Sequence, residues 1–222
     1  PQPRDYRKGL FKFTTTQYGT RPRREDLIRT LKRGIPGTSM PSFARLSQAE
    51  LEAVADYVIA LSRRGELEIL LVLEADPDEP DFDPEVVQEF VDQIAQDWKM
   101  ADYSIVTPLT PMPEFTAEDV AVGRELFTSE DIGCLKCHGA DGRGQTAANV
   151  VTPLKDVWGD DARAADLTSG IFRGGSEPVD IYHRIYNGIN GTPLPGFGPS
   201  QKIRDDPEFL AKLLAYVLTV SW

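Results

Sequence analysis

Both cysteines of this 222-residue chain lie in one short stretch, where two residues separate them and a histidine follows at once. On a turn of helix, Cys134 and Cys137 share one face, and His138 comes directly after them. Each thiol can then add to one of the two vinyl groups of a haem, and the imidazole can reach the iron as the proximal ligand. Because C-x-x-C-H is the attachment signature of c-type haem, the stretch predicts one covalent haem c.

Two other kinds of site use closely spaced cysteines. A structural zinc ion needs four Cys or His ligands, and the only histidine outside the motif is His183, far along the chain. A redox-active dithiol needs a βαβ setting, and the flanking residues supply no apolar run typical of a strand. The haem interpretation therefore fits the residues best.

The surroundings of the motif resemble those of a bacterial class I cytochrome c. Val122-Gly123-Arg124-Glu125-Leu126-Phe127 comes before it, and Gly139-Ala140-Asp141-Gly142-Arg143-Gly144 follows it. The resemblance covers residues 116–222 and implies an all-α cytochrome c fold with one complete haem domain. It also implies haem-pocket roles for Pro153, Tyr182, Ile185, Leu194 and Phe197.

Two of these implications concern single contacts. In the family, a proline carbonyl after the motif accepts the N–H of the proximal imidazole, and Pro153 is the candidate acceptor for His138, although it also fits an ordinary loop. A small residue in the first helix lets it cross closely against an aromatic of the C-terminal helix. The expected pair is Gly123 and Tyr216. A glycine inside a helix destabilises it by about 1 kcal/mol, and a close helix crossing would explain its presence.

The two ends of the chain repeat one another. Residues 26–43 match residues 180–197 at a constant offset, and an apolar-periodic helix with a tyrosine, Tyr57 or Tyr216, follows each copy. Residues 1–64 therefore resemble the C-terminal part of a first cytochrome c-like domain, whose front half with its own C-x-x-C-H is absent from this sequence. A second haem is expected in the intact domain, with Met40 as its distal ligand, and a haem-free first domain is the alternative.

The repeat also places Leu194 where class I cytochromes c carry the distal methionine, and leucine cannot ligate iron. His183 is expected on the solvent side of its helix, opposite Ile181. Met100 and Met112 precede the domain and reach the iron only if that segment folds across the pocket. A five-coordinate iron, a bound small ligand and a ligand from a partner chain also stay open.

Residues 65–115 form a predicted acidic connector between the copies. After a Pro-rich loop, Asp83 is a predicted N-cap and Pro84 the first helical position, and apolar residues recur at helical spacing over residues 84–100. An amphipathic helix is therefore expected there. The carboxylates of the loop lack the glycine and terminal glutamate of an EF-hand, which argues against a calcium site.

The net charge of -11 argues against nucleic acid, whose phosphates would repel the chain. The charge is uneven: residues 4–33 are basic, while residues 66–97 are acidic and contain neither Lys nor Arg. These segments fit solvated faces, and the basic one also fits a docking patch for an acidic redox partner. No apolar run is long enough to span a bilayer.

The resemblance implies a periplasmic or otherwise extracytoplasmic protein, and the absence of cysteines beyond the motif agrees with an oxidising compartment. We expect single-electron transfer, as a carrier or as a subunit of a respiratory oxidoreductase, with a redox protein as partner and no catalytic residues. Because of Leu194, a haem domain with an open sixth site, for small-ligand binding or peroxidase-like chemistry, is the alternative. A purely structural subunit is the third hypothesis.

Overall fold

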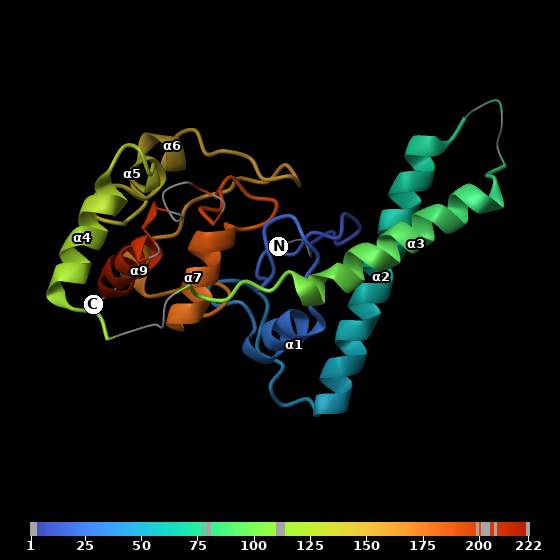
Figure 1. The fold of residues 1–222 in the computed structure, drawn as a ribbon, viewed down its shortest axis with the longest axis horizontal. Helices are drawn as coiled ribbons and strands as arrows, with labels where there is room; N and C mark the ends of the chain where they lie inside the picture. Colours follow the sequence, from blue (N-terminus) through green and yellow to red (C-terminus); the bar gives the residue numbers. More distant parts are fainter. Residues whose placement is uncertain are drawn as a thin grey trace. The chain divides into compact units, whose positions relative to one another are not determined.

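A computed structural model describes most of the chain, namely residues 4–76, 78, 81–109, 114–198, 200, 205–206 and 208–220. Within these residues the fold is all-α, as predicted, and its extended contacts include the isolated bridges Thr16 to Ile105 and Lys155 to Asp161 (Figure 1). No helix among them has the length and apolar character needed to cross a bilayer. The chain forms two compact units, Pro1–Gly34 with Pro41–Val106, and Ile35–Met40 with Thr107–Trp222.

In its described residues, the first unit contains three α-helices and a short 3-10 turn. These are α1 (Arg24–Arg33), α2 (Gln48–Glu74), α3 (Pro84–Met100) and η1 (Ala101–Tyr103). The side chain of Ser47 accepts a hydrogen bond from the amide of Glu50, whose carboxylate accepts one from the amide of Ser47, so a capping box starts α2. Asp83 caps α3 by accepting from the Glu85 amide, which confirms the helix predicted over residues 84–100.

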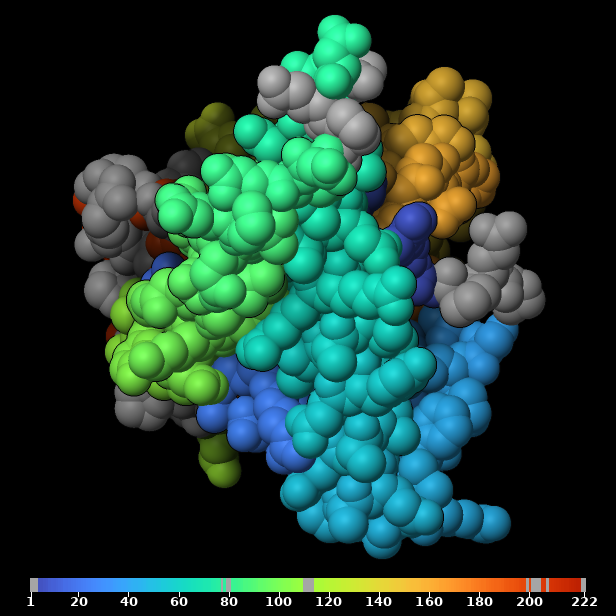
Figure 2. Space-filling view, turned by 90° about the vertical axis from the view of Figure 1, so that its right-hand side faces the viewer, coloured from blue at the N-terminus to red at the C-terminus, as the bar shows by residue number. Residues whose placement is uncertain are grey.

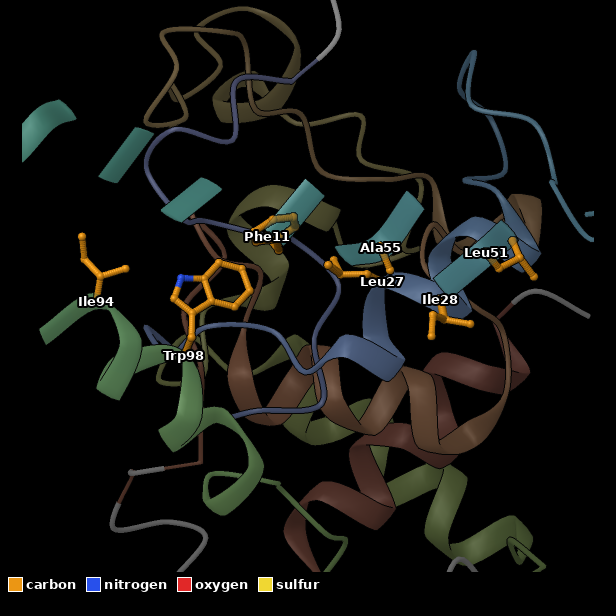
Figure 3. Close-up of a cluster of buried hydrophobic side chains, with 7 residues drawn as sticks. All are labelled: Phe11, Leu27, Ile28, Leu51, Ala55, Ile94 and Trp98. Carbon is orange, nitrogen blue, oxygen red and sulfur yellow. The ribbon is translucent and has the colours of Figure 1, made fainter. Parts of the chain in front are cut away.

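The helix predicted within a connector contributes to the core of the first unit. Figure 3 shows Phe11, Leu27, Ile28, Leu51, Ala55, Ile94 and Trp98, which are all buried. Phe11 meets Trp98 edge to face, with ring centroids 6.1 Å apart. Figure 2 shows α2 and α3 packed side by side, in agreement with their contacts. The sequence predicted a separate connector over residues 65–115. In the structure, the residues up to Val106 belong to the first unit.

A buried carboxylate joins three segments of this unit. Glu66 on α2 accepts hydrogen bonds from Arg21 Nε at 2.9 Å and Nη2 at 2.5 Å. It also accepts one from Trp98 Nε1 on α3, at 2.9 Å. Glu66 lies in an acidic run of the sequence, but it is 6% exposed and ties the N-terminal segment and α3 to α2.

Several arginines of the basic segment form ion pairs within the same unit. Besides Arg21, Arg24 pairs with Asp56 at 2.6 Å, and Arg29 pairs with the buried Asp26 at 2.9 Å. Each pair offsets a positive charge locally, so the positive field of the segment is weaker than its composition indicates. These pairs lower the positive charge of part of the segment, and a docking role for it stays a prediction.

The second unit contains the C-x-x-C-H motif. Its elements are α4 (Ala117–Thr128), α5 (Cys134–His138), α6 (Ala147–Val150), η2 (Leu167–Ser169), α7 (Pro178–Asn187) and α9 (Phe209–Thr219). A capping box between Thr116 and Asp119 starts α4. α4 packs on α9, and α9 also packs on α7.

Gly123 lies where α4 crosses α9, which confirms the predicted close crossing. A Cβ built on Gly123 would overlap the Lys212 carbonyl oxygen and would lie 2.9 Å from the Cβ of Tyr216. The obstructing oxygen belongs to the backbone of α9 and cannot rotate away. The glycine therefore sets the distance between the two helices.

Replacing Gly123 with alanine is expected to destabilise the second unit by about 3 kcal/mol, because the added methyl group overpacks the crossing. In an open helix the same change would stabilise by about 1 kcal/mol, so the sign of the effect is diagnostic. Chemical denaturation followed by circular dichroism measures it. Ala121→Gly, at an exposed position of the same helix, is the matched control and should lose only about 1 kcal/mol. A Gly123→Ala protein as stable as the original would contradict the crossing.

Candidate haem site

The two cysteines lie on a single helical turn bounded by glycines. Gly133 precedes α5 with φ at 82°, and Gly139 follows it with φ at 73°, both values that side chains with a Cβ rarely adopt. The helix can therefore start and stop within five residues. Cys134 and Cys137 are half-buried, and neither forms a disulfide. Burial raises the pKa of the Cys134 thiol to about 11, so its surroundings favour an uncharged sulfur such as a thiol or thioether.

His138 is oriented by one backbone carbonyl. Its Nδ1 lies 3.1 Å from the carbonyl oxygen of Ala165, which can only accept, so Nδ1 carries the proton and Nε2 keeps its lone pair. Burial lowers the pKa of His138, while the bond to Ala165 acts in the opposite direction. The imidazole is therefore neutral near pH 7, which is the form that ligates a metal. The bond to a carbonyl also increases the donor strength of Nε2.

Pro153 does not supply this carbonyl, so that assignment is wrong. After the motif the chain forms α6 and then folds back toward α5. This brings the carbonyl of Ala165, and not that of Pro153, to His138. Pro153 is half-buried in the same loop. A proline could be chosen from the sequence by resemblance, but the residue whose carbonyl faces the imidazole depends on how the loop folds back.

Asn149 holds the returning loop in place. Its side chain donates to the carbonyl of Gly144 at 2.7 Å and to that of Ala164 at 3.1 Å, and it accepts from the Ala164 amide at 2.6 Å. The residue is 6% exposed, so these bonds are shielded from water. Asn149 thereby sets the position of Ala165 opposite His138. No sequence signal points to this role, because a single asparagine in a short helix has no distinctive spacing.

The crossing of α4 and α9 also reaches the motif. Phe127 of α4 is 2% exposed, and its ring centroid lies 6.1 Å from that of His138 and 5.1 Å from that of Tyr216. The hydroxyl of Tyr216 donates to the carbonyl of Ala140, at 3.4 Å. The two terminal helices of the unit therefore restrain α5 and the residues that follow it.

The loop after α7 has the same hydrogen bonds as its counterpart after α1. The Ile35 amide donates to the Met40 carbonyl, and the Ile189 amide donates to the Leu194 carbonyl. In the same way, Phe43 donates to Leu31, and Phe197 donates to Ile185. The repeat seen in the sequence is thus a repeat of structure, and Leu194 has the backbone position of Met40. Met40 itself is half-buried in Ile35–Met40, a segment that belongs to the second unit.

The other predicted pocket residues lie on α7 or on the loop after it. Ile185, Leu194 and Phe197 are half-buried, and the bond from the Phe197 amide to the Ile185 carbonyl, 3.1 Å long, brings helix and loop together. Tyr182 is buried, stacks on Tyr186 and accepts a hydrogen bond from the amide of Leu109. Contact of these side chains with a haem stays a prediction.

His183 is buried, at 8% exposed, and not on the surface as predicted. Its ring meets that of Tyr182 edge to face, with centroids 6.2 Å apart. Helical spacing correctly predicts that His183 lies on the side of α7 away from Ile181. Spacing alone does not predict whether other residues pack on that side and bury it. Asp180 and Asn187, on the same side of α7, are also buried.

The donor set fits a covalently attached haem. Two free thiols and a neutral imidazole with one bare nitrogen stand on one helical turn, and these are the groups that such a cofactor requires. Among the described residues, no cluster of three or more His, Cys, Asp or Glu is arranged to hold a metal ion. Cys134, Cys137 and His138 are therefore the residues that would hold the cofactor.

Comparisons with known proteins give one structural likeness. No protein-family model matches the sequence, and no curated protein does. A chain of the solved reducing HAO-like protein complex of Kuenenia stuttgartiensis is similar, with a TM-score of 0.74 and 26% sequence identity. The alignment covers 100% of this chain and 83% of that chain. Together with the helical architecture, this likeness assigns the chain an all-α, cytochrome-like fold.

Proposed function

We propose that this chain is an extracytoplasmic c-type cytochrome that passes single electrons through a covalently bound haem. It acts either as a carrier or as a subunit of a respiratory oxidoreductase. One observation carries the proposal: Cys134, Cys137 and His138 occupy one helical turn, and the carbonyl of Ala165 fixes the imidazole with Nε2 unprotonated. When bound, a haem c supplies a reversible one-electron iron couple.

The residues of the chain have distinct roles in this proposal. Cys134 and Cys137 tether the cofactor, and His138 is its proximal ligand. Ala165 fixes the tautomer and the direction of the ring, as partners of a ligand commonly do. Phe127 excludes water from one side of the imidazole. Nothing in this set transforms a substrate, so we assign the chain no catalysis of its own.

The structural likeness supports a protein partner. The similar Kuenenia stuttgartiensis chain belongs to a protein complex whose name describes it as reducing and HAO-like. By analogy, we propose that this chain docks to a redox protein and exchanges electrons with it. The basic segment is the candidate docking surface, and the ion pairs of Arg24 with Asp56 and of Arg21 with Glu66 reduce the positive field that would steer a partner.

A mass measurement tests the proposal. The chain is produced with a bacterial signal sequence and the haem c maturation apparatus, and the intact protein is weighed. We expect the mass of the polypeptide plus one haem, together with a reduced absorption spectrum typical of a c-type haem. We expect no attached haem when the same chain is retained in the cytoplasm. A periplasmic product with the mass of the bare polypeptide would refute the assignment.

Leu194 favours a second candidate function, a haem domain with an open sixth site. Its backbone has the hydrogen bonds of Met40, yet its side chain has no atom that can ligate iron. An iron without a second protein ligand can bind small molecules. Carbon monoxide added to the native ferrous protein distinguishes the two functions, because fast and complete binding favours the open site and slow or absent binding favours electron transfer.

Replacing Leu194 with methionine is expected to close such an open site. The repeat assigns this position to a distal ligand, so the thioether would be able to bind the iron. We expect the affinity for carbon monoxide to fall by about tenfold or more and the reduction potential to rise. Titration of the ferrous protein with carbon monoxide and a redox titration measure the two effects. Leu194→Ile, which adds no ligand, is the matched control and should behave as the native protein does. Unchanged binding in Leu194→Met would mean that Leu194 lies away from the sixth position.

A further inference from the structure

The last part of α2 carries exposed aliphatic side chains on one side. Ile69, Val72 and Leu73 are 38%, 75% and 78% exposed, and their spacing of three and four residues places them on a single stripe. Leu67 and Leu70, on another side of the same stretch, pack against the core of the first unit. A helix in contact with water normally exposes polar residues on its outer side, so a stripe of adjacent aliphatic residues is typical of an interaction surface.

Negative charge surrounds this aliphatic stripe. No Lys or Arg occurs from residue 66 to residue 97, and Figure 1 shows that α2 ends and α3 begins at the same end of their hairpin. Glu74 at the end of α2, together with Glu85 and Glu89 on α3, is exposed, and none of the three forms an ion pair with a described residue. Their charges are therefore not compensated by the described part of the chain, and they give this end of the hairpin a negative field.

The charge decides which kind of molecule can cover the stripe. A second copy of the hairpin, an anionic lipid surface and nucleic acid would each bring negative charge against negative charge. The basic segment of a second copy is less suited as well, because Arg21 and Arg24 are already paired with Glu66 and Asp56. A different protein with an apolar groove bordered by lysines and arginines matches both the stripe and the carboxylates around it.

We infer that the aliphatic stripe of Ile69, Val72 and Leu73 is the docking face for a different protein, whose surface has an apolar groove bordered by lysines and arginines. Burial of the three aliphatic side chains supplies affinity, while the basic border pairs with the carboxylates of the hairpin, speeds the encounter and fixes its orientation. These residues belong to the first unit and not to the C-x-x-C-H turn. The inference therefore goes beyond the proposed function and does not depend on a bound haem.

A designed peptide is the first probe of the stripe. It is an amphipathic helix made of leucine and lysine, and its matched control replaces every leucine with serine at the same charge. Fluorescence anisotropy of the labelled peptides measures their binding to the purified protein, whose haem content is determined separately. We expect the leucine peptide to bind about tenfold or more tightly than the serine peptide, because only the leucines can bury the stripe.

Two variants with the same added charge separate apolar contact from charge. Val72→Asp should weaken binding of the leucine peptide by about tenfold or more, although one more negative charge alone would strengthen the binding of a basic peptide. Tyr103→Asp, at a residue that is 74% exposed beyond the other end of α3, is the matched control and should not weaken it. Circular dichroism of both variants checks that the helices are intact. Equal binding of the two peptides, or undiminished binding by Val72→Asp, would overturn the inference.

Carbodiimide cross-linking in cells that naturally make the chain tests for the partner itself, because this reagent joins carboxylates directly to lysines. We expect mass spectrometry to find links from Glu74 or Glu85 to lysines of one other protein. These links should disappear in Val72→Asp and persist in Tyr103→Asp. The inference fails if the hairpin forms no such link, if its links join only two copies of this chain, or if Val72→Asp leaves them unchanged.

Discussion

A chain in which both Cys134 and Cys137 are replaced by alanine should leave the haem maturation apparatus with the mass of the bare polypeptide. The two sulfurs on α5 are the only ones that can form thioethers, since the chain has no further cysteine. Without them, any haem in the pocket is held by noncovalent contacts and by His138 alone. We therefore expect complete loss of covalent haem, and denaturing gels stained for haem together with intact mass measure it.

The two histidines provide matched variants for the same experiment. His138→Ala should retain both thioethers and the added mass but change the spectrum, because the ligand aligned by Ala165 is lost. His183→Ala removes the other histidine of the chain, and we expect it to keep both the mass and the spectrum of the original protein. Covalent haem in the protein that lacks both cysteines would contradict the site, and a changed spectrum in His183→Ala would identify that residue as an iron ligand.

Replacing Glu66 with alanine should destabilise the first unit by about 3 to 5 kcal/mol. The change leaves the guanidinium of Arg21, whose side chain is 19% exposed, without its carboxylate, and it removes the acceptor of Trp98 Nε1. Breaking a buried pair on one side is costly because the remaining charge loses both its water and its partner. Denaturant unfolding followed by circular dichroism and by hydrogen exchange of α2 measures the loss.

Glu68, two residues further along α2, provides the control. It pairs with Arg64 where both side chains are at least half exposed, so Glu68→Ala should change stability by less than about 1 kcal/mol. In a second control, Arg21→Met combined with Glu66→Leu removes both charges and should recover part of the lost stability, because Trp98 Nε1 still lacks its acceptor. Equal effects of Glu66→Ala and Glu68→Ala would show that the buried pair has no special role.

The local features of this protein could be predicted from its sequence, because they depend on residues a few positions apart. The spacing of Cys134, Cys137 and His138 predicts a haem site, and the structure places the three residues on one helical turn. Asp83 and Pro84 predicted the start of α3, and the structure begins the helix there. The repeat, which compares one part of the chain with another, located Leu194 and Met40 in equivalent loops.

Only the tertiary structure decided which distant residues meet. Ala165, and not Pro153, faces His138, because the buried Asn149 ties the returning loop to Gly144. Glu66 is buried beside Arg21, although the sequence around it resembles a solvated acidic run. Such contacts join residues far apart in the chain, and their geometry depends on how loops close and on what covers each helical face. Helical spacing predicts which side chains share a face, but burial and partners come from packing between elements.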